Sequence, residues 1–413
     1  MWNKVTQMND ISKILVAMLL GSLVGIIVGE PATRIGFVGT IWINMMRMFL
    51  VPIVLCMLIK GITSMDSPKT LGRVGTRFIM FYLTTTIFAS VVGLAFTRLF
   101  SPGTGFRYTA SDTAGVKVAA LPGIDEFFTS MFSKNIFESF TKGDMMQVLI
   151  ISVVMGVAIV LLPEDKRKPV RDWFVSMADL VMSIINIALK LAPIGVFCLM
   201  AAALGKYGIV LLISMGKLLG TFYLACAVHL IFVYCIILWM FTGMTPLYFL
   251  KRSMQTIVTC ISTCSSNAAI PVNMSVAKEQ FDVDDSVAGL GISLGATINK
   301  DGVAVLCGVV LLFSAQAMGI TLSIDQLLNI IFVTALVTSA GSGVPGGGLM
   351  NLMIVAAAVG IPLEIVIMVG GFYRFFDMGT TTMNCLGDMS ATVIIDRLEK
   401  KRAKKENNDM ANA

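Results

Sequence analysis

Four polar residues recur along one face of the last apolar segment of the chain. They are spaced i, i+4, i+7 and i+11, and are Asp377, Thr381, Asn384 and Asp388. On an α-helix this spacing places all four on a single stripe. A carboxylate at the centre of a bilayer costs at least about 2.5–3.5 kcal/mol on insertion scales, so two acids on one stripe indicate a bound cation, a cationic ligand group or a proton. A polar seam between packed helices is the structural alternative.

A second oxygen-rich stretch is GATINKDG, at 295–302. It contains Thr297, Asn299 and Asp301 between Gly295 and Gly302. Glycines allow a helix to unwind and to turn its carbonyl groups toward an ion, and hard cations bind several oxygens of the types found here. The stretch is therefore a candidate cation site.

An earlier apolar segment, MFYLTTTIF, adds Tyr82, Thr85 and Thr86. Tyr82 and Thr86 share a helix face because they are four residues apart. Threonines in membrane helices usually bond to their own backbone, so this group alone predicts no site.

The elements that must position these residues are membrane helices. Of the 413 residues, 56% are apolar and 14% are charged, against roughly 45–50% and 25% in soluble domains. This excludes a soluble globular protein. The eight cysteines lie in apolar segments without ligand spacing, so neither a disulfide framework nor a zinc site is expected. The first half predicts six helices, at about 13–30, 36–64, 76–99, 145–162, 174–203 and 207–243.

Loop charge orients these helices in the membrane. The net charge of +6 comes from basic residues in short loops and at the C-terminus, a pattern of topology rather than of nucleic-acid binding. The basic loops, with both termini, are expected on the cytoplasmic side, and the polar stretch at 100–125 outside. We expect a multi-pass protein of the cytoplasmic (inner) membrane, surrounded by lipid. The basic loop residues are Lys69, Arg73, Arg77, Lys166, Arg167, Lys168, Arg171, Lys251 and Arg252.

Two apolar segments of the second half are interrupted by small and polar residues. They read ISTCSSNAAIP (261–271) and TSAGSGVPGGG (338–348). Irregular backbone exposed to lipid is not tolerated at membrane depth, so each should form a re-entrant hairpin whose tip is buried in protein or faces a cavity. Each hairpin precedes a helix with acids, and such paired broken segments indicate the binding site of a transporter. We predict an all-α polytopic membrane protein with eight transmembrane helices and two re-entrant helical hairpins.

With these motifs the chain resembles the glutamate transporter family, also called the dicarboxylate/amino acid:cation symporters, over nearly its whole length. The resemblance is carried by SSNAAIP, by SGVPGGG, by DMGTTTMNCLGD, and by NKDG where the family usually has Asn-Met-Asp-Gly-Thr. It implies inverted repeats and a homotrimer. In each subunit a transport domain would cross the membrane like an elevator, with the second hairpin as the extracellular gate.

The resemblance also implies a division of this single membrane unit, 1–413. A scaffold would span about 13–75 and 124–205, and the transport domain about 76–100 and 206–398. Within the transport domain, hairpin 1 is expected at about 245–280, helix 7 at about 285–314, hairpin 2 at about 325–360 and helix 8 at about 363–398. Residues 399–413 would form a cytoplasmic tail.

The roles of individual residues follow from the same resemblance. Asp377 would bind the α-ammonium of an amino acid, and Asn384 and Ser266 its α-carboxylate. The implied substrate site comprises Ser265, Ser266, Val303, Gly343, Val344, Pro345, Gly348, Asp377, Thr380, Thr381 and Asn384.

Sodium ions are the implied coupling ions, with protons as the alternative, and no enzyme cofactor is expected. One sodium would be held by Asp388 with carbonyls of Gly295, Asn299 and Asn384. A second would be held by Tyr82, Thr85, Thr86, Asn299 and Asp301. A third would be held by Thr297 and by carbonyls near Thr338 and Ser339.

The chain departs from the family at the position that selects the substrate. Members that carry acidic substrates have an arginine three residues after the ammonium-binding aspartate, and here that residue is Thr380. Val303 replaces the threonine that helps the same carboxylate, and Cys264 replaces an arginine of the first hairpin. These changes favour a small neutral amino acid, as in the neutral amino-acid members. Arg374 keeps open an acidic amino acid or a dicarboxylate, unless it only pairs with a nearby acid.

A further departure is Lys300, where the family has methionine. Its ammonium could take the place of a sodium ion beside the buried acids, which would lower the number of coupled ions or make transport sensitive to pH. Alternatively, the side chain extends to an aqueous face.

Other classes of protein explain the pattern less well. Ala-Gly-Ser-Gly at 340–343 is close to a membrane serine protease motif, but His229 is the only histidine, and one histidine in an apolar helix is typical of a packed core residue. A channel is the other alternative. We therefore expect no enzyme, but a secondary active symporter for an amino acid, most simply a small neutral one, driven by sodium or proton entry.

Overall fold

The computed structural model describes residues 10–63, 68–106, 108, 129, 132–339 and 346–411, and over these ranges it consists of helices and turns without a strand. Large apolar side chains such as Ile27, Phe37 and Phe232 are exposed on its surface. Such a surface suits lipid rather than water. Among the described helices, those long and apolar enough to cross a bilayer are Arg73–Phe100, Ile209–Thr242 and Asp285–Ala317.

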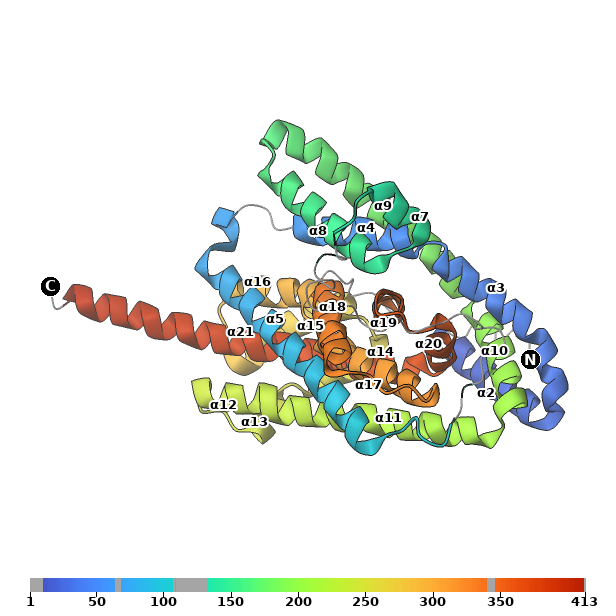
Figure 1. The fold of residues 1–413 in the computed structure, drawn as a ribbon. Helices are drawn as coiled ribbons and strands as arrows, with labels where there is room; N and C mark the ends of the chain where they lie inside the picture. The colour runs from blue at the N-terminus through green and yellow to red at the C-terminus, as the bar shows by residue number, and fades with distance from the viewer. Residues whose placement is uncertain are drawn as a thin grey trace.

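A first helix group comes mainly from the N-terminal half (Figure 1). In it α10 packs against α2 and α3, and α4 packs against α8 and α9. Glycines allow the close approach of α2 to α10, since a Cβ atom at Gly21 would lie 2.4 Å from the carbonyl oxygen of Phe197. The group comprises α2 (Asp10–Val28), the 3-10 turn η1 (Glu30–Ile35), α3 (Gly36–Arg47), α4 (Leu50–Thr63), α7 (Ile136–Lys142), α8 (Met145–Leu161), α9 (Glu164–Lys190) and α10 (Ala192–Tyr207).

A second helix group contains α5 and the C-terminal half. Its centre is α17, which packs against α5, α11 and α21. The group comprises α5 (Pro68–Phe100), α11 (Ile209–His229), the π-helical turn η2 (Leu230–Cys235), α12 (Ile236–Thr242), α13 (Pro246–Arg252), α14 (Met254–Thr263), α15 (Ser266–Phe281), α16 (Asp285–Ile298), α17 (Asp301–Ala317), α18 (Ile324–Ser339), α19 (Gly347–Ala358), α20 (Leu363–Gly370) and α21 (Tyr373–Ala411).

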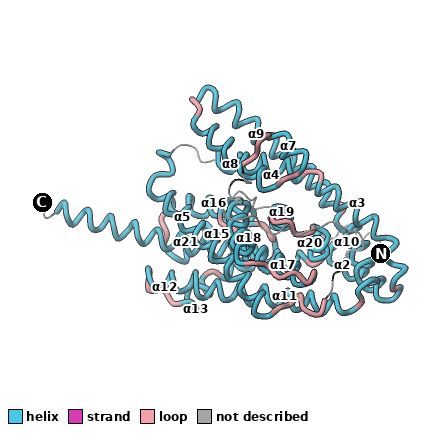
Figure 2. Tube along the Cα trace, viewed as in Figure 1, coloured by secondary structure: helices cyan, strands magenta, loops and turns pink. Residues whose placement is uncertain are grey.

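The two groups meet where α18 and α19 contact α8 and where α20 contacts α10. Figure 1 shows the hairpin helices α14, α15, α18 and α19 between α4 and α8 on one side and α11 on the other, and Figure 2 shows the described loops between helices in the same view. The division into a scaffold and a transport domain, and the movement of one against the other, stay predictions.

Some apolar runs expected as single helices are divided in the structure. The run at 36–64 breaks before α4, since the ring of Pro52 clashes with the carbonyl four residues earlier. The run at 174–203 breaks at Leu191, next to Pro193. Helix 8 is interrupted at 371–372, beside Gly370 and Gly371, and α21 then continues to Ala411, through most of the expected tail.

Charged side chains join α21 to its neighbours where it leaves the apolar core. Glu399 forms ion pairs with Arg73 and Arg77 of α5. Lys400 pairs with Asp396 at 3.1 Å and with Asp284, in the loop before α16, at 3.6 Å. These contacts fasten the polar end of α21 to the second helix group.

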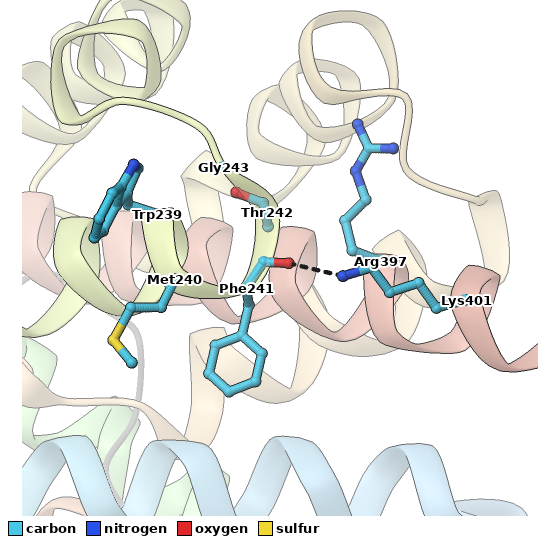
Figure 3. A pocket seen from close by; sticks show the side chains of 7 residues that line it. All are labelled: Trp239, Met240, Phe241, Thr242, Gly243, Arg397 and Lys401. Atoms are coloured by element: carbon cyan, nitrogen blue, oxygen red, sulfur yellow. Dashed lines mark hydrogen bonds between the residues drawn. The ribbon is translucent and has the colours of Figure 1, made fainter.

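A pocket lies between the end of α12 and α21 (Figure 3). Trp239 and Phe241 line one wall, and Arg397 and Lys401 line the other. The ammonium of Lys401 donates to the carbonyl oxygen of Phe241 at 3.5 Å. The pocket lies at the polar end of α21, beyond Asp388.

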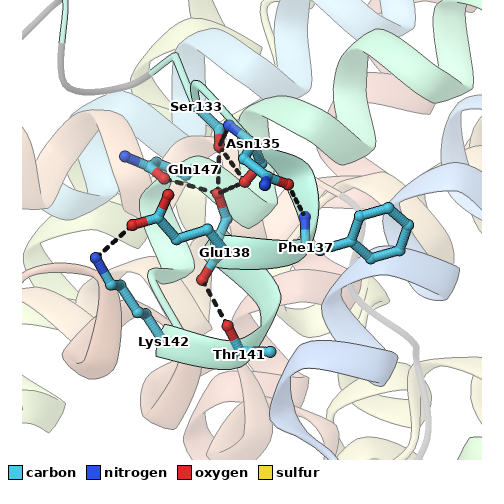
Figure 4. Close-up of polar contacts among 8 residues, drawn as sticks. Ser133, Asn135, Phe137, Glu138, Thr141, Lys142 and Gln147 are labelled. Carbon is cyan, nitrogen blue, oxygen red and sulfur yellow. Dashed lines mark hydrogen bonds and ion pairs between the residues drawn. The ribbon is translucent and has the colours of Figure 1, made fainter.

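Short helix α7 is held by side-chain caps (Figure 4). Asn135 Oδ1 accepts from the backbone nitrogen of Phe137 at 3.0 Å. The hydroxyl of Ser139 bonds to the hydroxyl of Ser133 and to the amide oxygen of Gln147. The bond to Asn135 satisfies an N-terminal backbone group that a helix leaves unpaired, and the Ser139 bonds join side chains around the helix.

Candidate functional site

Helix breaks in three parts of the chain meet α21. α14 ends at Thr263 and α15 begins at Ser266, α16 ends at Ile298 and α17 begins at Asp301, and α19 begins after Gly346. α14, α15, α16, α17 and α19 all pack against α21. A helix end leaves backbone N–H and C=O groups without intrahelical partners, so these breaks present polar backbone to the acids of α21.

The tip of the first hairpin turns at Cys264, whose φ of 47° lies in the left-handed region. Ser265 then caps α15, because its Oγ accepts from the backbone nitrogen of Ala268 at 3.2 Å. Ser266 is buried, and its hydroxyl contacts the thiol of Cys385 on α21. Of the two serines predicted to bind substrate, Ser266 thus lies against α21.

Asp377 is the acid nearest the second hairpin. It is 4% exposed. One carboxylate oxygen accepts from the hydroxyls of Tyr373 at 3.1 Å and Thr380 at 3.4 Å, and the other accepts from the backbone nitrogen of Gly346 at 3.3 Å. Asp377 therefore connects α21 directly to the hairpin, in a position to hold a cationic group.

Arg374 lies one turn before Asp377 and is also buried, with 8% of its surface exposed. Its guanidinium nitrogen Nη1 lies 3.7 Å from Asp377 Oδ2. Its Nε has no hydrogen-bond partner among the described residues. A buried arginine with an unused donor can bind a further carboxylate.

Small residues close the space beside Asp377. A Cβ atom at Gly348 would lie 2.4 Å from the hydroxyl of Tyr373 and 3.1 Å from Val303. Thr381 is buried on the predicted polar stripe. Gly343, Val344 and Pro345, also predicted to bind substrate, lie outside the described residues.

Asn384 joins α21 to the break between α16 and α17. Its side-chain oxygen accepts from the backbone nitrogen of Gly302 at 2.8 Å, and its backbone carbonyl accepts from the amide of Asn299 at 2.9 Å. The same Asn299 amide donates to Asp388 Oδ1 at 2.9 Å. Oδ2 of Asp388 and Oδ1 of Asn299 are buried and have no hydrogen-bond partner in the described structure.

The two unpaired oxygens show whether the residues here suit a cation. Both are acceptors, and hard cations bind carboxylate and amide oxygens. Gly295 packs so closely here that a Cβ atom would lie 2.2 Å from Asp388 Oδ1 and 2.9 Å from the hydroxyl of Tyr82. The oxygens around Asp388 are thus of the chemical type that binds a small cation, and the cation site itself stays a prediction.

Asp301 is surrounded by donors. The hydroxyls of Thr86 and Tyr234 donate to its two oxygens, each at 2.6 Å, and His229 Nε2 lies 3.4 Å from Oδ2. All four side chains are buried. Of the partners predicted for Asp301, Thr86 is in contact.

Other residues predicted to bind ions make different contacts. The hydroxyl of Tyr82 donates to the carbonyl of Gly291 at 2.9 Å, and that of Thr85 donates to the carbonyl of Tyr82. The hydroxyls of three further residues donate to carbonyls of their own helices; these residues are Thr297, Thr338 and Ser339. Their ion-binding roles stay predictions.

Tyr234 was not predicted from the sequence, and His229 was expected to be a packed core residue. Five positions separate them, so they do not share a face of an ordinary α-helix. The π-helical turn at 230–235 brings their rings together, edge to face, with centroids 4.9 Å apart. Such turns are frequent at functional sites. Tyr373 was also missed, although its i, i+4 spacing from Asp377 could have indicated the contact.

Comparison with known proteins places this site in context. A model described as the sodium:dicarboxylate symporter family matches residues 11–398. The chain is 31% identical to a "C4-dicarboxylate transport protein" of Paraburkholderia phymatum, over 94% of this chain and 92% of that protein. It is 29% identical to a "Proton/sodium-glutamate symport protein" of Bacillus subtilis, over the same shares. A protein of the same name from Geobacillus stearothermophilus is 30% identical, over 94% of both chains.

Proposed function

We propose that this chain, which belongs to the sodium:dicarboxylate symporter family, is a symporter for an acidic amino acid. The predicted all-α membrane fold and family are confirmed, and so is the expectation of a transporter rather than an enzyme. The coupling ions of the family are sodium or protons, as the names of the family and of the relatives state. The names of the relatives support an acidic substrate better than the neutral one favoured by the sequence.

The observation that carries this proposal is the pairing of Asp377 with Arg374. An acidic amino acid has an ammonium group and a second carboxylate. Asp377 supplies a buried negative charge, and Arg374 supplies a buried guanidinium whose Nε is unpaired in the described structure. With the ammonium on Asp377, Arg374 would release that acid and bind the substrate's side-chain carboxylate. A C4 dicarboxylate lacks the ammonium, so it would leave Asp377 as an unfavourable like charge.

A small neutral amino acid is the second candidate. Thr380 and Val303 stand where acidic-substrate members have an arginine and a threonine. The hydroxyl of Thr380 donates to Asp377, so it is directed at the ammonium-binding acid and not at a second carboxylate. If Arg374 only neutralises Asp377, the site would accept serine or alanine.

The coupling proposal concerns the break between α16 and α17. Asn299 and Asp301 would hold a coupling cation, which supplies fixed positive charge among the acids here, and Asp388 requires a further positive charge beside it. Asn299 and Asn384 orient the broken backbone against α21 through their 2.9 and 2.8 Å bonds. The backbone nitrogen of Gly346, in the second hairpin, donates to Asp377. Substrate bound to Asp377 would therefore favour one position of this hairpin over another. Coupling requires such a difference in affinity between two conformations.

Assembly and orientation belong to the same proposal. The exposed apolar side chains of the first helix group, among them Ile27 and Phe37, are available for lipid and for contacts between subunits of a homotrimer. The ion-paired end of α21 at Glu399 and Lys400, with its run of basic residues, would lie on the cytoplasmic side of the inner membrane.

Competition during uptake tests the substrate. Purified protein in proteoliposomes would take up radiolabelled aspartate, with serine, alanine, glutamate and succinate as competitors, with and without a sodium gradient. We expect glutamate to compete and serine, alanine and succinate to compete weakly. Competition by serine and alanine alone would support the neutral candidate, and succinate as the best competitor would support a dicarboxylate carrier.

A further inference from the structure

The side chain of Lys300 caps the C-terminal end of α16, the first half of the broken helix. Its backbone has φ −132° and ψ 41°, outside the helical region, and the residue is 2% exposed. The ammonium turns back and donates to the carbonyl of Ala296. In a continuous helix that carbonyl would accept from the backbone nitrogen of Lys300, but α16 ends at Ile298. The side chain thus replaces a lost backbone bond.

This position is one that favours positive charge. The C-terminal end of a helix carries a partial negative charge on its unpaired carbonyls. In transporters with broken helices, these ends coordinate the coupling cation. The ammonium of Lys300 is therefore bonded to the type of group that would otherwise bind an ion.

Asp388 supplies the opposing charge. Its carboxylate is fully buried, Oδ1 accepts from the amide of Asn299, the residue before Lys300, at 2.9 Å, and Oδ2 is without a hydrogen-bond partner in the described structure. The two side chains do not form a direct ion pair here, because the ammonium is held at Ala296. A buried carboxylate needs a compensating positive charge. Among the other titratable side chains near Asp388 are Asp301, which is acidic, and Cys385, and neither supplies that charge.

We propose that Lys300 is a tethered cation that competes with a sodium ion for Asp388, so that the chain binds one sodium ion fewer than it would with methionine at this position. The inference rests on the proposed symport only for its consequence, a lower number of coupled ions. The snorkelling alternative is disfavoured by the burial of Lys300. A fixed ammonium and a sodium ion carry the same charge, so both at once would leave an excess positive charge beside one carboxylate.

Sodium binding without substrate tests this directly. The thermal stability of purified protein would be measured in sodium chloride and in choline chloride of equal concentration. We expect sodium to raise the melting temperature of Lys300→Met by several degrees more than that of the wild type. Adding Asp388→Asn to Lys300→Met should remove the gain. Lys217→Met, which removes an exposed lysine on α11, should behave as the wild type.

An equal sodium response in the wild type and Lys300→Met would overturn the proposal, as would a gain that persists in the double variant. If Lys300→Met does not fold, the single variant Asp388→Asn tests the proposal. Sodium should raise its melting temperature as much as that of the wild type, because Lys300 already keeps sodium from Asp388. Loss of this sodium response would contradict the competition. These outcomes need no substrate, so they differ from a failure of the proposed transport. In addition, the affinity for substrate should depend more steeply on sodium in Lys300→Met, by one ion.

Discussion

The side-chain oxygen of Asn384 accepts a hydrogen bond from the backbone nitrogen of Gly302, 2.8 Å away, at the first turn of α17. The backbone carbonyl of the same asparagine accepts from Asn299, just before the break. One residue of α21 therefore fixes both sides of the interruption between α16 and α17. The candidate cation and substrate sites share Asn384, so a displacement of this residue at one site would also change the other site.

Replacing Asn384 with alanine should weaken this junction. The buried N–H of Gly302 would lose its partner, at a cost of about 1–3 kcal/mol. We expect a lower melting temperature and weaker substrate binding in the same variant. Thr382→Ala, on the same helix but bonded only to the carbonyl of Met378, is the matched control and should change neither. Unaltered binding by Asn384→Ala would show that the junction does not serve the substrate site.

Asp377→Asn should abolish amino-acid binding and leave the fold intact. The amide keeps an acceptor for Gly346 or Tyr373 but removes the charge that would hold an ammonium group. Calorimetric titration with aspartate and a melting curve separate the two effects. Tight binding by this variant would refute the ammonium-binding role.

Arg374→Met should lower the affinity for acidic substrates by about 1.5–3 kcal/mol, roughly 10- to 150-fold, because a charged hydrogen bond to the second carboxylate is lost. Serine and alanine should lose little. Arg98→Met, which removes an exposed arginine at the end of α5, controls for the loss of charge. Equal effects on acidic and neutral amino acids would assign Arg374 a structural pairing with Asp377.

Gly295→Ala should displace the Asp388 carboxylate, since the new Cβ atom would lie 2.2 Å from its Oδ1. Gly289→Ala is a matched control on the same helix, where the nearest atom to a new Cβ is the end of Met274 at 3.9 Å. We expect sodium- or proton-driven uptake to be lost in the first variant and kept in the second. Similar uptake by both would mean that Asp388 can move aside without consequence.

Lys400 predicts a pH dependence of stability. Partial burial lowers the pKa of its ammonium, but ion pairs with Asp396, Asp284 and Asp282 outweigh this and raise the pKa above its ordinary value of 10.5. Because the pKa is higher in the folded state, the ion pairs stabilise the protein fully at pH values below the pKa of the unfolded state. This contribution to stability is lost as the pH rises through the pKa of the folded state. Because the pairs are partly exposed, Lys400→Met should cost only about 0–1 kcal/mol near neutral pH.

Melting curves of Lys400→Met and the wild type should therefore converge above pH 10.5. Lys404→Met, an exposed lysine one turn further along α21, should match the wild type throughout. A difference that grows with pH would have the wrong sign for this ion pair.

Much of the site could be predicted from the sequence because it depends on local rules. Glycine, serine and proline placed the helix breaks near 264, 299 and 346, and helical spacing placed Asp377, Asn384 and Asp388 on one buried stripe. These features follow from backbone preference and from the 3.6-residue period alone.

Other features depend on packing between distant segments. The contact of His229 and Tyr234 with Asp301 requires a π-helical turn, which shifts the register of α11 and has no signature in an apolar run. The bond from Lys300 to Ala296 depends on how the broken helix ends. The choice between acidic and neutral substrates depends on where the Arg374 guanidinium points, which spacing alone does not fix.

Gradient-driven accumulation tests the central claim most directly. Proteoliposomes containing the wild-type chain would receive labelled aspartate at equal concentration inside and outside, with an inward gradient of sodium or protons, and internal aspartate would be followed over time. The account predicts net accumulation that stops when an ionophore removes the gradient and that is absent with Asp377→Asn. Equilibration without accumulation under either gradient would contradict it.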